Sequence, residues 1–444
     1  MSEQLWSKNL PLDEKIHIFT VGDDPVTDQQ LLLFDIIGSA VHARMLGESG
    51  LLPEAEAKKL VRQLRKLKNS EIKLTREGED CHTALEHALG EAGKGIHLAR
   101  SRNDQVQTAL RLLMRARLLD LADALAICVS QSLEFAGRHR ASVMPGYTHM
   151  RRAMPSSWGM WSAAIAEGLL EELEQVPALW SRLDRSPLGV AAGFGAPVPI
   201  NRERTAELLG FGRVQRNPGD VMNSRGRHEQ AVAAWIVSAA GTIEKTMWDL
   251  LLWSTDEFGF VRLPDAFTTG SSLMPQKRNP DVLELARGTC RQLRGSAALV
   301  SQLSGGLPSS YHRDQQLLKA PFLQLLAKAQ QLFEIFARLI PALEVDKEKS
   351  AAACSFEIHA AREACRLAAE GMPFRDAYAR VAQQIQEGSF KPASEKTSGP
   401  ELEIEEPAAE LRKMQSWLRD RRGFLERTTA RRAHHHGQYW RIFA

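Results

Sequence analysis

Residues 104–140 read DQVQTALRLLMRARLLDLADALAICVSQSLEFAGRHR, a pattern typical of one long helix. The stretch contains no proline, and its single glycine, Gly137, lies close to the end. At ~1.5 Å per residue, such a helix is about 55 Å long. Its apolar residues recur at intervals of three and four positions, as they do on one face of an α-helix: Val106, Leu110, Met114, Leu118, Leu121, Leu125 and Val129.

Four further stretches have the same helical spacing. The first is expected to break near Pro177 and the last to kink at Pro321, because an internal proline removes a backbone hydrogen bond. No alternating strand pattern runs between them, and no Gly-x-Gly-x-x-Gly follows a strand, which argues against a doubly wound sheet. We therefore predict an all-α chain with a central bundle of five long helices. The four stretches are Pro155–Arg185, Arg227–Asp256, Pro280–Leu303 and Ser310–Leu339.

Changes in pattern divide the chain into three expected domains. Boundaries are expected near residues 98–104 and 341–349, which predicts an N-terminal helical domain (1–100), the central bundle (101–345) and a C-terminal helical domain (346–444). The segment 388–406 is rich in Pro, Ser, Lys and Glu and is expected to be a loop between two helical parts of the last domain.

One part of the predicted bundle is apolar on nearly every helical face. The stretch Ala231–Ala240 mixes five alanines with Val232, Trp235, Ile236 and Val237, and we expect it to be buried on all sides. Two interpretations remain open at this point. The helix lies either in the core of a monomer or in a core shared between several chains.

Composition excludes several classes of protein. The chain has 43% hydrophobic and 25% charged residues, which are ordinary globular values, and a net charge of only +3, which does not favour a nucleic-acid partner. No apolar run reaches membrane-spanning length, so we expect no membrane partner. The polar start Met1–Gln4 lacks the features of a signal peptide. We expect a cytoplasmic protein whose partner is a small-molecule substrate.

Cysteine and histidine usage does not indicate a metal site. The five cysteines are odd in number and form no Cys-x-x-Cys pair, so we expect reduced, mostly buried thiols. His434–His436 lie beside several arginines near the C-terminus and are not interpreted as metal ligands. We therefore predict no metal site.

Residues 270–281, GSSLMPQKRNPD, carry the clearest chemistry. Gly270 allows unusual backbone angles, while two prolines stiffen the loop, so it presents side chains instead of packing them. Ser271 and Ser272 offer hydroxyls, Lys277 a positive charge and Asn279 an amide. A plain helix start at Pro280, with Asp281 and Glu284 in its first turn, accounts for the end of the stretch but not for the serines and the lysine.

This loop resembles the signature of the fumarase/aspartase superfamily of β-elimination lyases, specifically its argininosuccinate lyase branch. Further segments resemble that branch in the same order along the chain, and the resemblance spans about residues 28–320. These segments are DIIGSAVHA (35–43), EDCH (79–82), RSRNDQV (100–106), MPGYTH (144–149) and LPSSYHRDQQ (307–316).

The resemblance implies an activity and an assembly. The activity is the β-elimination of argininosuccinate to L-arginine and fumarate in arginine biosynthesis, without a cofactor. The assembly is a homotetramer of three-domain chains whose central bundles merge and whose active sites are shared between chains.

The resemblance also implies catalytic roles. Ser271 is the general base, and its alkoxide needs the loop amides and Lys277 for stabilisation. Asn279 and Lys277 stabilise the carboxylate on which charge grows, and Ser272 supports them. His149 protonates the leaving nitrogen or orients the group that does so. Glu284 is expected to hold His149 or Lys277 in place.

Binding roles are implied for a larger set. For Arg102, a cation at a helix start is disfavoured by the helix dipole, which favours function over a solvated surface charge. For Gln316 and Lys319, the alternative is a solvent-exposed helical face. His82 and His97 are expected to be structural or to support the residues that contact the substrate. The implied contacts are Ser101, Arg102, Asn103 and Thr148 to the succinyl carboxylates, Asp35 and Ser39 to the amino-acid end, and Arg225, Tyr311, Gln316 and Lys319 to the remainder.

Three departures from the family pattern keep the substrate open. Two amides after His149 are replaced by Arg151 and Met154, the opening Leu5–Leu10 lacks two glycines and an arginine, and residues 223–226 lack two acids around the arginine. They leave open a related carbon–nitrogen lyase that releases fumarate from another N-substituted aspartate. A third hypothesis is a binding scaffold without turnover, which has no need for the loop chemistry.

Overall fold

A computed structural model describes residues 13–68, 70, 72–76, 79–393 and 404–429. The expectations for Leu5–Leu10, for His434–His436 and for residues 394–403 of the 388–406 loop lie outside the described residues. None of the described helices is long and apolar enough to cross a membrane.

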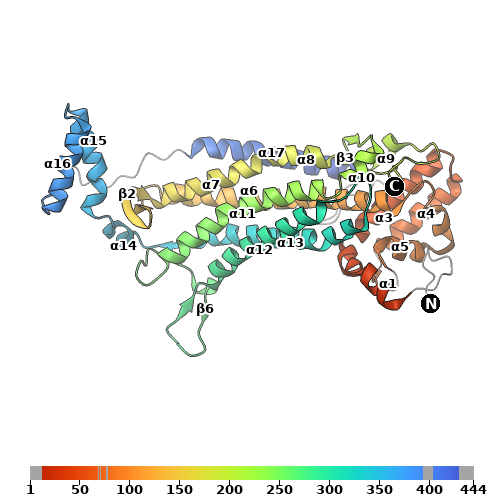
Figure 1. Ribbon diagram of the computed structural model, residues 1–444, viewed down its shortest axis with the longest axis horizontal. Helices are drawn as coiled ribbons and strands as arrows, with labels where there is room; N and C mark the ends of the chain where they lie inside the picture. The colour runs from red at the N-terminus through yellow and green to blue at the C-terminus, as the bar shows by residue number, and fades with distance from the viewer. Residues whose placement is uncertain (1–12, 69, 71, 77–78, 394–403, 430–444) are drawn as a thin grey trace.

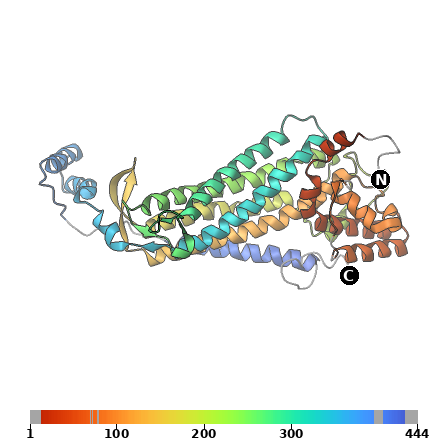
Figure 2. The ribbon, with the colours of Figure 1, turned by 90° about the horizontal axis from the view of Figure 1, so that it is seen from below.

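Five of the described helices run along the long axis of the molecule and form the predicted bundle (Figure 1). Helix α7 is continued by α8 (Val176–Leu183), and the break falls at Gln175, just before Pro177, as expected. The view turned by 90° shows the same elongated bundle (Figure 2), so the predicted all-α fold is confirmed. The five helices are α6 (Arg102–Arg138), α7 (Trp158–Glu174), α11 (Arg227–Trp253), α12 (Asp281–Ser304) and α13 (Lys319–Ala342).

The start predicted for the last long helix was wrong. Residues before Lys319 form a loop and the 3-10 helix η5 (Arg313–Leu318), and α13 begins at Lys319. Pro321 therefore lies in the first turn, where no intrahelical donor is lost, and it does not kink the helix.

Helix α6 is anchored at its start by a capping box. The Ser101 hydroxyl accepts the Asn103 N–H at 3.2 Å, and the Asp104 carboxylate accepts the Ser101 N–H at 3.1 Å. Along its length α6 packs against α3 (Leu32–Glu48), α7, α13 and α17 (Glu405–Thr429), which buries most of its faces. The bundle is thus built around α6.

The apolar stretch of α11 is not buried on every face within the single chain. Val232, Trp235 and Ile236 are buried, but Ala234 and Ser238 are exposed. The expectation of burial on all sides is therefore wrong for one chain taken alone. The alternative of a core shared between chains stays open.

The N-terminal elements pack at one end of the bundle (Figure 1). Helix α3 contacts both α4 and α6 and so joins this part to the bundle. The elements are α1 (Glu14–Val21), α2 (Asp24–Thr27), η1 (Asp28–Gln30), α3, α4 (Glu54–Leu67), α5 (Cys81–Leu89) and η3 (Gly90–Gly95).

Short strands and helices connect the long helices. Strands β1 (Val143–Thr148) and β2 (Arg151–Ser157) form an antiparallel hairpin at the end of α6. The other strands have two residues each: β3 (Arg185–Ser186) is parallel to β4 (Arg213–Val214), while β5 (Val261–Arg262) with β8 (Glu344–Val345) and β6 (Thr269–Gly270) with β7 (Arg278–Asn279) are antiparallel. The connecting helices are α9 (Arg202–Leu208), α10 (Pro218–Asn223) and η4 (Asp265–Phe267).

The C-terminal residues take two different courses. Helices α14 (Lys347–Ala352), η6 (Phe356–His359), α15 (Ala360–Ala369) and α16 (Phe374–Gln386) extend beyond the bundle, and α15 and α16 enclose a small core of their own. Helix α17 returns along the bundle (Figure 1), where Arg422 pairs with Asp120 and Asp123 of α6. The division into three domains remains a prediction.

The five cysteines form no disulfide, in agreement with the sequence. Cys81, Cys128 and Cys290 are buried, Cys354 is half-buried and Cys365 is exposed. Burial raises the pKa of the Cys290 thiol to about 12, so this group stays protonated at neutral pH.

Candidate active site

Asp35 and Ser39 lie on α3 in a buried polar network. The Asp35 carboxylate accepts hydrogen bonds from Gln105 at 2.7 Å and His82 at 2.9 Å, and Arg100 donates to the Ser39 hydroxyl at 2.8 Å. Asp35 is only 1% exposed. Burial raises its pKa, but His82, Arg100 and Gln105 lower it by more, so the carboxylate is ionised. Both side chains therefore order their neighbours, and their contact with a substrate remains a prediction.

Asp35, His82 and Cys81 also form a group of three potential metal ligands whose donor atoms lie within 4.8 Å of one another. Nδ1 of His82 already bonds Asp35. Burial lowers the pKa of His82, but Asp35 raises it by more, which favours the imidazolium, and burial raises the pKa of the Cys81 thiol. A metal would have to displace both protons, because only a neutral imidazole and a thiolate are ligands. We interpret this group as a structural ion pair, which fits the structural role expected for His82.

Ser101, Arg102 and Asn103 form the start of α6. Arg102 pairs with Glu79 at 3.1 Å and Asp80 at 3.3 Å. The dipole mismatch that favoured function for Arg102 is thus offset by two carboxylates, which the local sequence did not indicate. Ser101 is engaged in the helix cap, while Asn103 is half-buried with no side-chain hydrogen bond in the described part of the chain.

Arg225, Tyr311 and Gln316 lie at this same end of the bundle. The Arg225 guanidinium lies over the Tyr311 ring at 5.6 Å. Gln316 donates to the carbonyls of Thr20 and Val21, each at 3.0 Å, and so fixes the end of α1. Gln316 therefore does not lie on a solvent-exposed helical face, which was the alternative to a binding role, because its side chain is half-buried and hydrogen-bonded.

Lys319 is even less compatible with a solvent-exposed helical face. It is 4% exposed and pairs with Asp24 at 2.8 Å and Asp28 at 2.6 Å. Burial lowers its pKa, but the two carboxylates raise it by more, so Lys319 is charged. The solvent-exposed interpretation is wrong for Lys319. Its ammonium ties α13 to the N-terminal part.

Thr148 and His149 lie at the opposite end of the bundle. They are exposed at the tip of the β1–β2 hairpin, where His149 (φ 51°) and Met150 (φ 60°) adopt left-handed backbone angles. Such angles are uncommon for residues other than glycine, although histidine adopts them more often than most, and two in succession point to a specific turn. Tyr147 holds the hairpin beside the segment before β5, because its ring packs edge-on against that of Phe258 with 6.1 Å between the ring centroids.

The loop 270–281 projects from this same end between β6 and β7 (Figure 1). The Ser271 hydroxyl accepts the backbone N–H groups of Leu273 at 3.3 Å and Met274 at 3.1 Å. Asn279 donates weakly to the Gly270 carbonyl at 3.5 Å. Ser272 and Lys277 are exposed. The loop therefore displays its polar groups, as the sequence predicted.

Glu284 is exposed in the first turn of α12. Within the described part of one chain it forms no ion pair or hydrogen bond with His149 or Lys277. Within a single chain, Glu284 therefore does not hold His149 or Lys277 in place as expected.

The candidate residues thus form two groups at opposite ends of the bundle. Helix α6 has 37 residues and joins the first group to the His149 hairpin, a span of about 55 Å at ~1.5 Å per residue. Helix α12, with 24 residues, similarly separates the 270–281 loop from the Tyr311 segment by about 36 Å. A single chain does not bring the two groups together around one small molecule.

Asp104 is a structural residue that the site assignment missed. Besides capping α6, it accepts the N–H groups of Gly189 at 3.0 Å and Ala191 at 2.9 Å and so fixes a glycine-rich loop next to Ser101. The capping-box pattern Ser-x-x-Asp was visible in the sequence. The contact between Asp104 and this loop was not visible in the sequence, because Gly189 lies 85 positions away.

Comparisons with known proteins agree with this architecture. A family model described as Lyase matches residues 11–295. Among solved structures, EDDS lyase in complex with formate has a TM-score of 0.78 at 22% identity, with 94% of both chains covered. Class II fumarase from Schistosoma mansoni has a TM-score of 0.73 at 15% identity, covering 91% of this chain and 93% of that one. The fold and the family match define an all-α lyase.

Closer relatives in sequence narrow this class. Argininosuccinate lyase from Sorangium cellulosum is 44% identical over 395 residues, which covers 87% of this chain and 91% of the relative. Argininosuccinate lyase from Thermotoga neapolitana is 39% identical, covering 86% of this chain and 98% of the relative. The chain belongs to the argininosuccinate lyase family, as the resemblance of its motifs predicted.

Proposed function

We propose that this chain is an argininosuccinate lyase, which converts argininosuccinate to L-arginine and fumarate in arginine biosynthesis in the cytoplasm. The observation that carries the proposal is the 270–281 loop, which displays Ser271, Lys277 and Asn279 on a stiff turn. The relatives that are 37–44% identical and bear this name support it.

The environment of Ser271 supports its role as the general base. Two backbone N–H groups point at its Oγ, and such donors stabilise an oxyanion more than a neutral hydroxyl. In the proposed step, the Ser271 alkoxide takes the proton from the carbon next to a carboxylate. The electron pair left on that carbon forms the double bond of fumarate as the carbon–nitrogen bond breaks.

The remaining roles follow the charge through the reaction. The carboxylate next to the deprotonated carbon becomes a dianion, which Lys277 and Asn279 stabilise as cation and donor, with Ser272 in support. The leaving nitrogen takes up a proton from His149 or from a group that His149 orients. Asn103, Ser101, Arg102 and Thr148 are the proposed contacts to the succinyl carboxylates.

We further propose that complete sites form only where several copies of the chain meet, in a homotetramer. The separation of about 55 Å along α6 supports this proposal, because one small substrate does not span it. The long helices also leave apolar side chains exposed, among them Ile127, Trp248 and Leu285, which a shared core between chains would cover.

The second candidate function is a related carbon–nitrogen lyase that acts on another N-substituted aspartate. The exposure of Arg151 and Met154 beside His149 favours keeping it, because these are the positions where the family has amides. The two candidates share the elimination chemistry and differ in the leaving group.

Ultraviolet detection of fumarate after addition of argininosuccinate, with arginine measured in parallel, tests the proposal. Equal amounts of both products are expected. Fumarate from another N-substituted aspartate only would favour the second candidate. If none of these compounds yields fumarate, the remaining hypothesis is a binding scaffold without turnover.

A further inference from the structure

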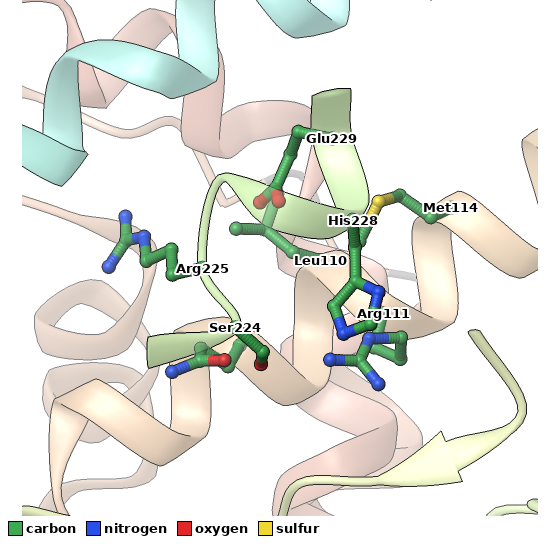
Figure 3. A pocket seen from close by; sticks show the side chains of 8 residues that line it. Leu110, Arg111, Met114, Ser224, Arg225, His228 and Glu229 are labelled. Carbon is green, nitrogen blue, oxygen red and sulfur yellow. The ribbon is translucent and has the colours of Figure 1, made fainter. Parts of the chain in front are cut away.

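A cluster of buried polar groups lies between α6 and the start of α11 (Figure 3), and of these groups only Arg225 is also an implied substrate contact. Arg111, Arg225, His228 and Glu229 line a cavity there, against apolar walls from Leu110 and Met114. The space not filled by protein is about 190 Å³, part of it open to solvent. The enclosed part of this space has room for about one water molecule or small ion, so an amino-acid-sized substrate does not fit.

The lining carries an excess of positive charge. Arg111 is 1% exposed, and its guanidinium donates to the Arg185 carbonyl at 2.9 Å and to the Gln215 side-chain oxygen at 3.4 Å, both neutral acceptors. Arg225 is 6% exposed and stacks on Tyr311. Of the eight described residues in the lining, Glu229 alone bears a carboxylate. Two guanidinium groups against one carboxylate leave one net positive charge.

Glu229 itself is turned to the backbone. Its carboxylate accepts the Gly226 N–H at 2.8 Å as part of the cap of α11. Glu229 still favours the charged form of Arg111, so one of the two guanidinium groups is left without a counter-charge. A buried cation of this kind is unfavourable, which makes an anion beside Arg111 and Arg225 favourable. The start of the 27-residue helix α11 adds to this field, since His228 and Glu229 lie in its first turn.

His228 supplies unpaired polar atoms at the same place. It is 5% exposed, and neither ring nitrogen has a hydrogen-bond partner in the described part of the chain. Burial, and then Arg111 and Arg227, lower its pKa to about 2, so the ring is neutral and has one N–H to donate. The Nε atoms of Arg111 and Arg225 likewise have no partner among the described residues.

We propose that this cavity binds one small monovalent inorganic anion of the chloride class. The N–H of His228 and the guanidinium groups of Arg111 and Arg225 are its donors, and its single negative charge balances the lining. The binding site does not depend on the activity proposed above. Because Arg225 is one of the donors, the anion fixes this guanidinium beside Tyr311.

Diffraction from crystals of the full-length protein grown in bromide tests the position. An anomalous bromide peak is expected within hydrogen-bond distance of His228 and Arg111. Peaks confined to the molecular surface, an adventitious ion only, or a water in the cavity at high bromide concentration would overturn the proposal.

The melting temperature, Tm, tests the same site in solution. At constant ionic strength, replacing sodium glutamate by sodium bromide is expected to raise the Tm of the wild type in a saturable manner. The variant His228→Leu is expected to lose this rise. The matched control is His359→Leu, because His359 is equally buried and has an unpaired Nδ1 but lies in η6, outside this cavity.

An unchanged bromide response in His228→Leu would contradict the proposal, as would loss of the response in His359→Leu. If His228→Leu does not fold, the bromide diffraction experiment on the wild type decides alone.

Discussion

The two ends of the bundle differ in the burial and pairing of their polar side chains. At the N-terminal end, Asp35 and Lys319 are buried and already paired within the chain. At the other end, His149 and Lys277 are exposed on a hairpin tip and a projecting loop. One end is therefore organised by its own chain, whereas the other presents its groups outward. This difference favours a site completed by another copy of the chain. Two experiments test that site, and two test how much the buried groups contribute to stability.

The largest effect is expected at the exposed end. Ser271→Ala removes the proposed base and should lower kcat by about 10²–10⁴-fold without loss of the folded assembly. Initial rates of fumarate formation and size-exclusion chromatography measure the two properties. Ser272→Ala is the neighbouring control and should have a smaller effect. Turnover of Ser271→Ala close to that of the wild type would remove Ser271 from the base role.

Mixed assemblies test whether the two ends of different chains cooperate. Ser271→Ala and Asn103→Ala alter opposite ends, so tetramers formed from both variants should regain part of the activity that each lacks. The experiment co-expresses the two chains and compares the rates with those of each variant alone.

The matched control for this experiment mixes Ser271→Ala with Lys277→Ala, which alter the same loop and should give no recovery. Absence of recovery in both mixtures would mean that one chain supplies the whole site, or that Asn103 does not take part in it.

The buried end should instead respond in stability. Lys319→Met leaves Asp24 and Asp28 buried without their cation, and breaking such a buried pair costs about 3–5 kcal/mol. Urea unfolding measures the free energy of unfolding. Lys328→Met on the same helix is the control, since no ion pair of Lys328 is seen in the described structure. A loss for Lys319→Met no larger than for the control would show that the buried pair contributes little.

The smallest effect concerns pH. Burial raises the pKa of Asp24 from 3.8 to about 6, with the Asp28 carboxylate adding to the rise and Lys319 opposing it. A raised folded-state pKa means that the stabilisation is present below pH ~4 and is lost as pH rises through about 6. At 1.36 kcal/mol per pKa unit, this loss is on the order of 3 kcal/mol.

Asp24→Asn should therefore flatten the decrease in unfolding free energy between pH 4 and 6, while Asp23→Asn, an exposed neighbour, should leave it unchanged. The measurement is urea unfolding at several pH values. An identical pH dependence in the wild type and Asp24→Asn would assign the titration to other groups.

Much of the bundle was predictable because helical periodicity is a local property. The spacing from Val106 to Val129 predicted α6 to within two residues at each end, and Pro177 marked the break between α7 and α8. The error at α13 had a local cause as well. Pro321 was taken as an internal proline, but the chain before Lys319 does not form an α-helix.

The site was predictable only in part. The displayed chemistry of residues 270–281 followed from the two prolines in sequence, whereas Gly270 lies in β6 and does not adopt the unusual backbone angles expected of it. The burial of Lys319 did not, because Asp28, its partner, lies 291 positions away. The carboxylate partners of Arg102 were not predictable for the same reason, since Glu79 and Asp80 lie more than 20 positions before it in sequence.

The amino-acid sequence by itself determined the helical periodicity, the chemistry of the exposed loop and the family motifs, because each is encoded within a few consecutive residues. Only the tertiary structure decided which charged groups are buried and paired and which remain exposed, whereas the separation of about 55 Å already followed from the predicted length of α6. The physical reason is that burial and pairing depend on which distant segments pack together. The length of α6 places the motifs at its two ends at opposite ends of the molecule.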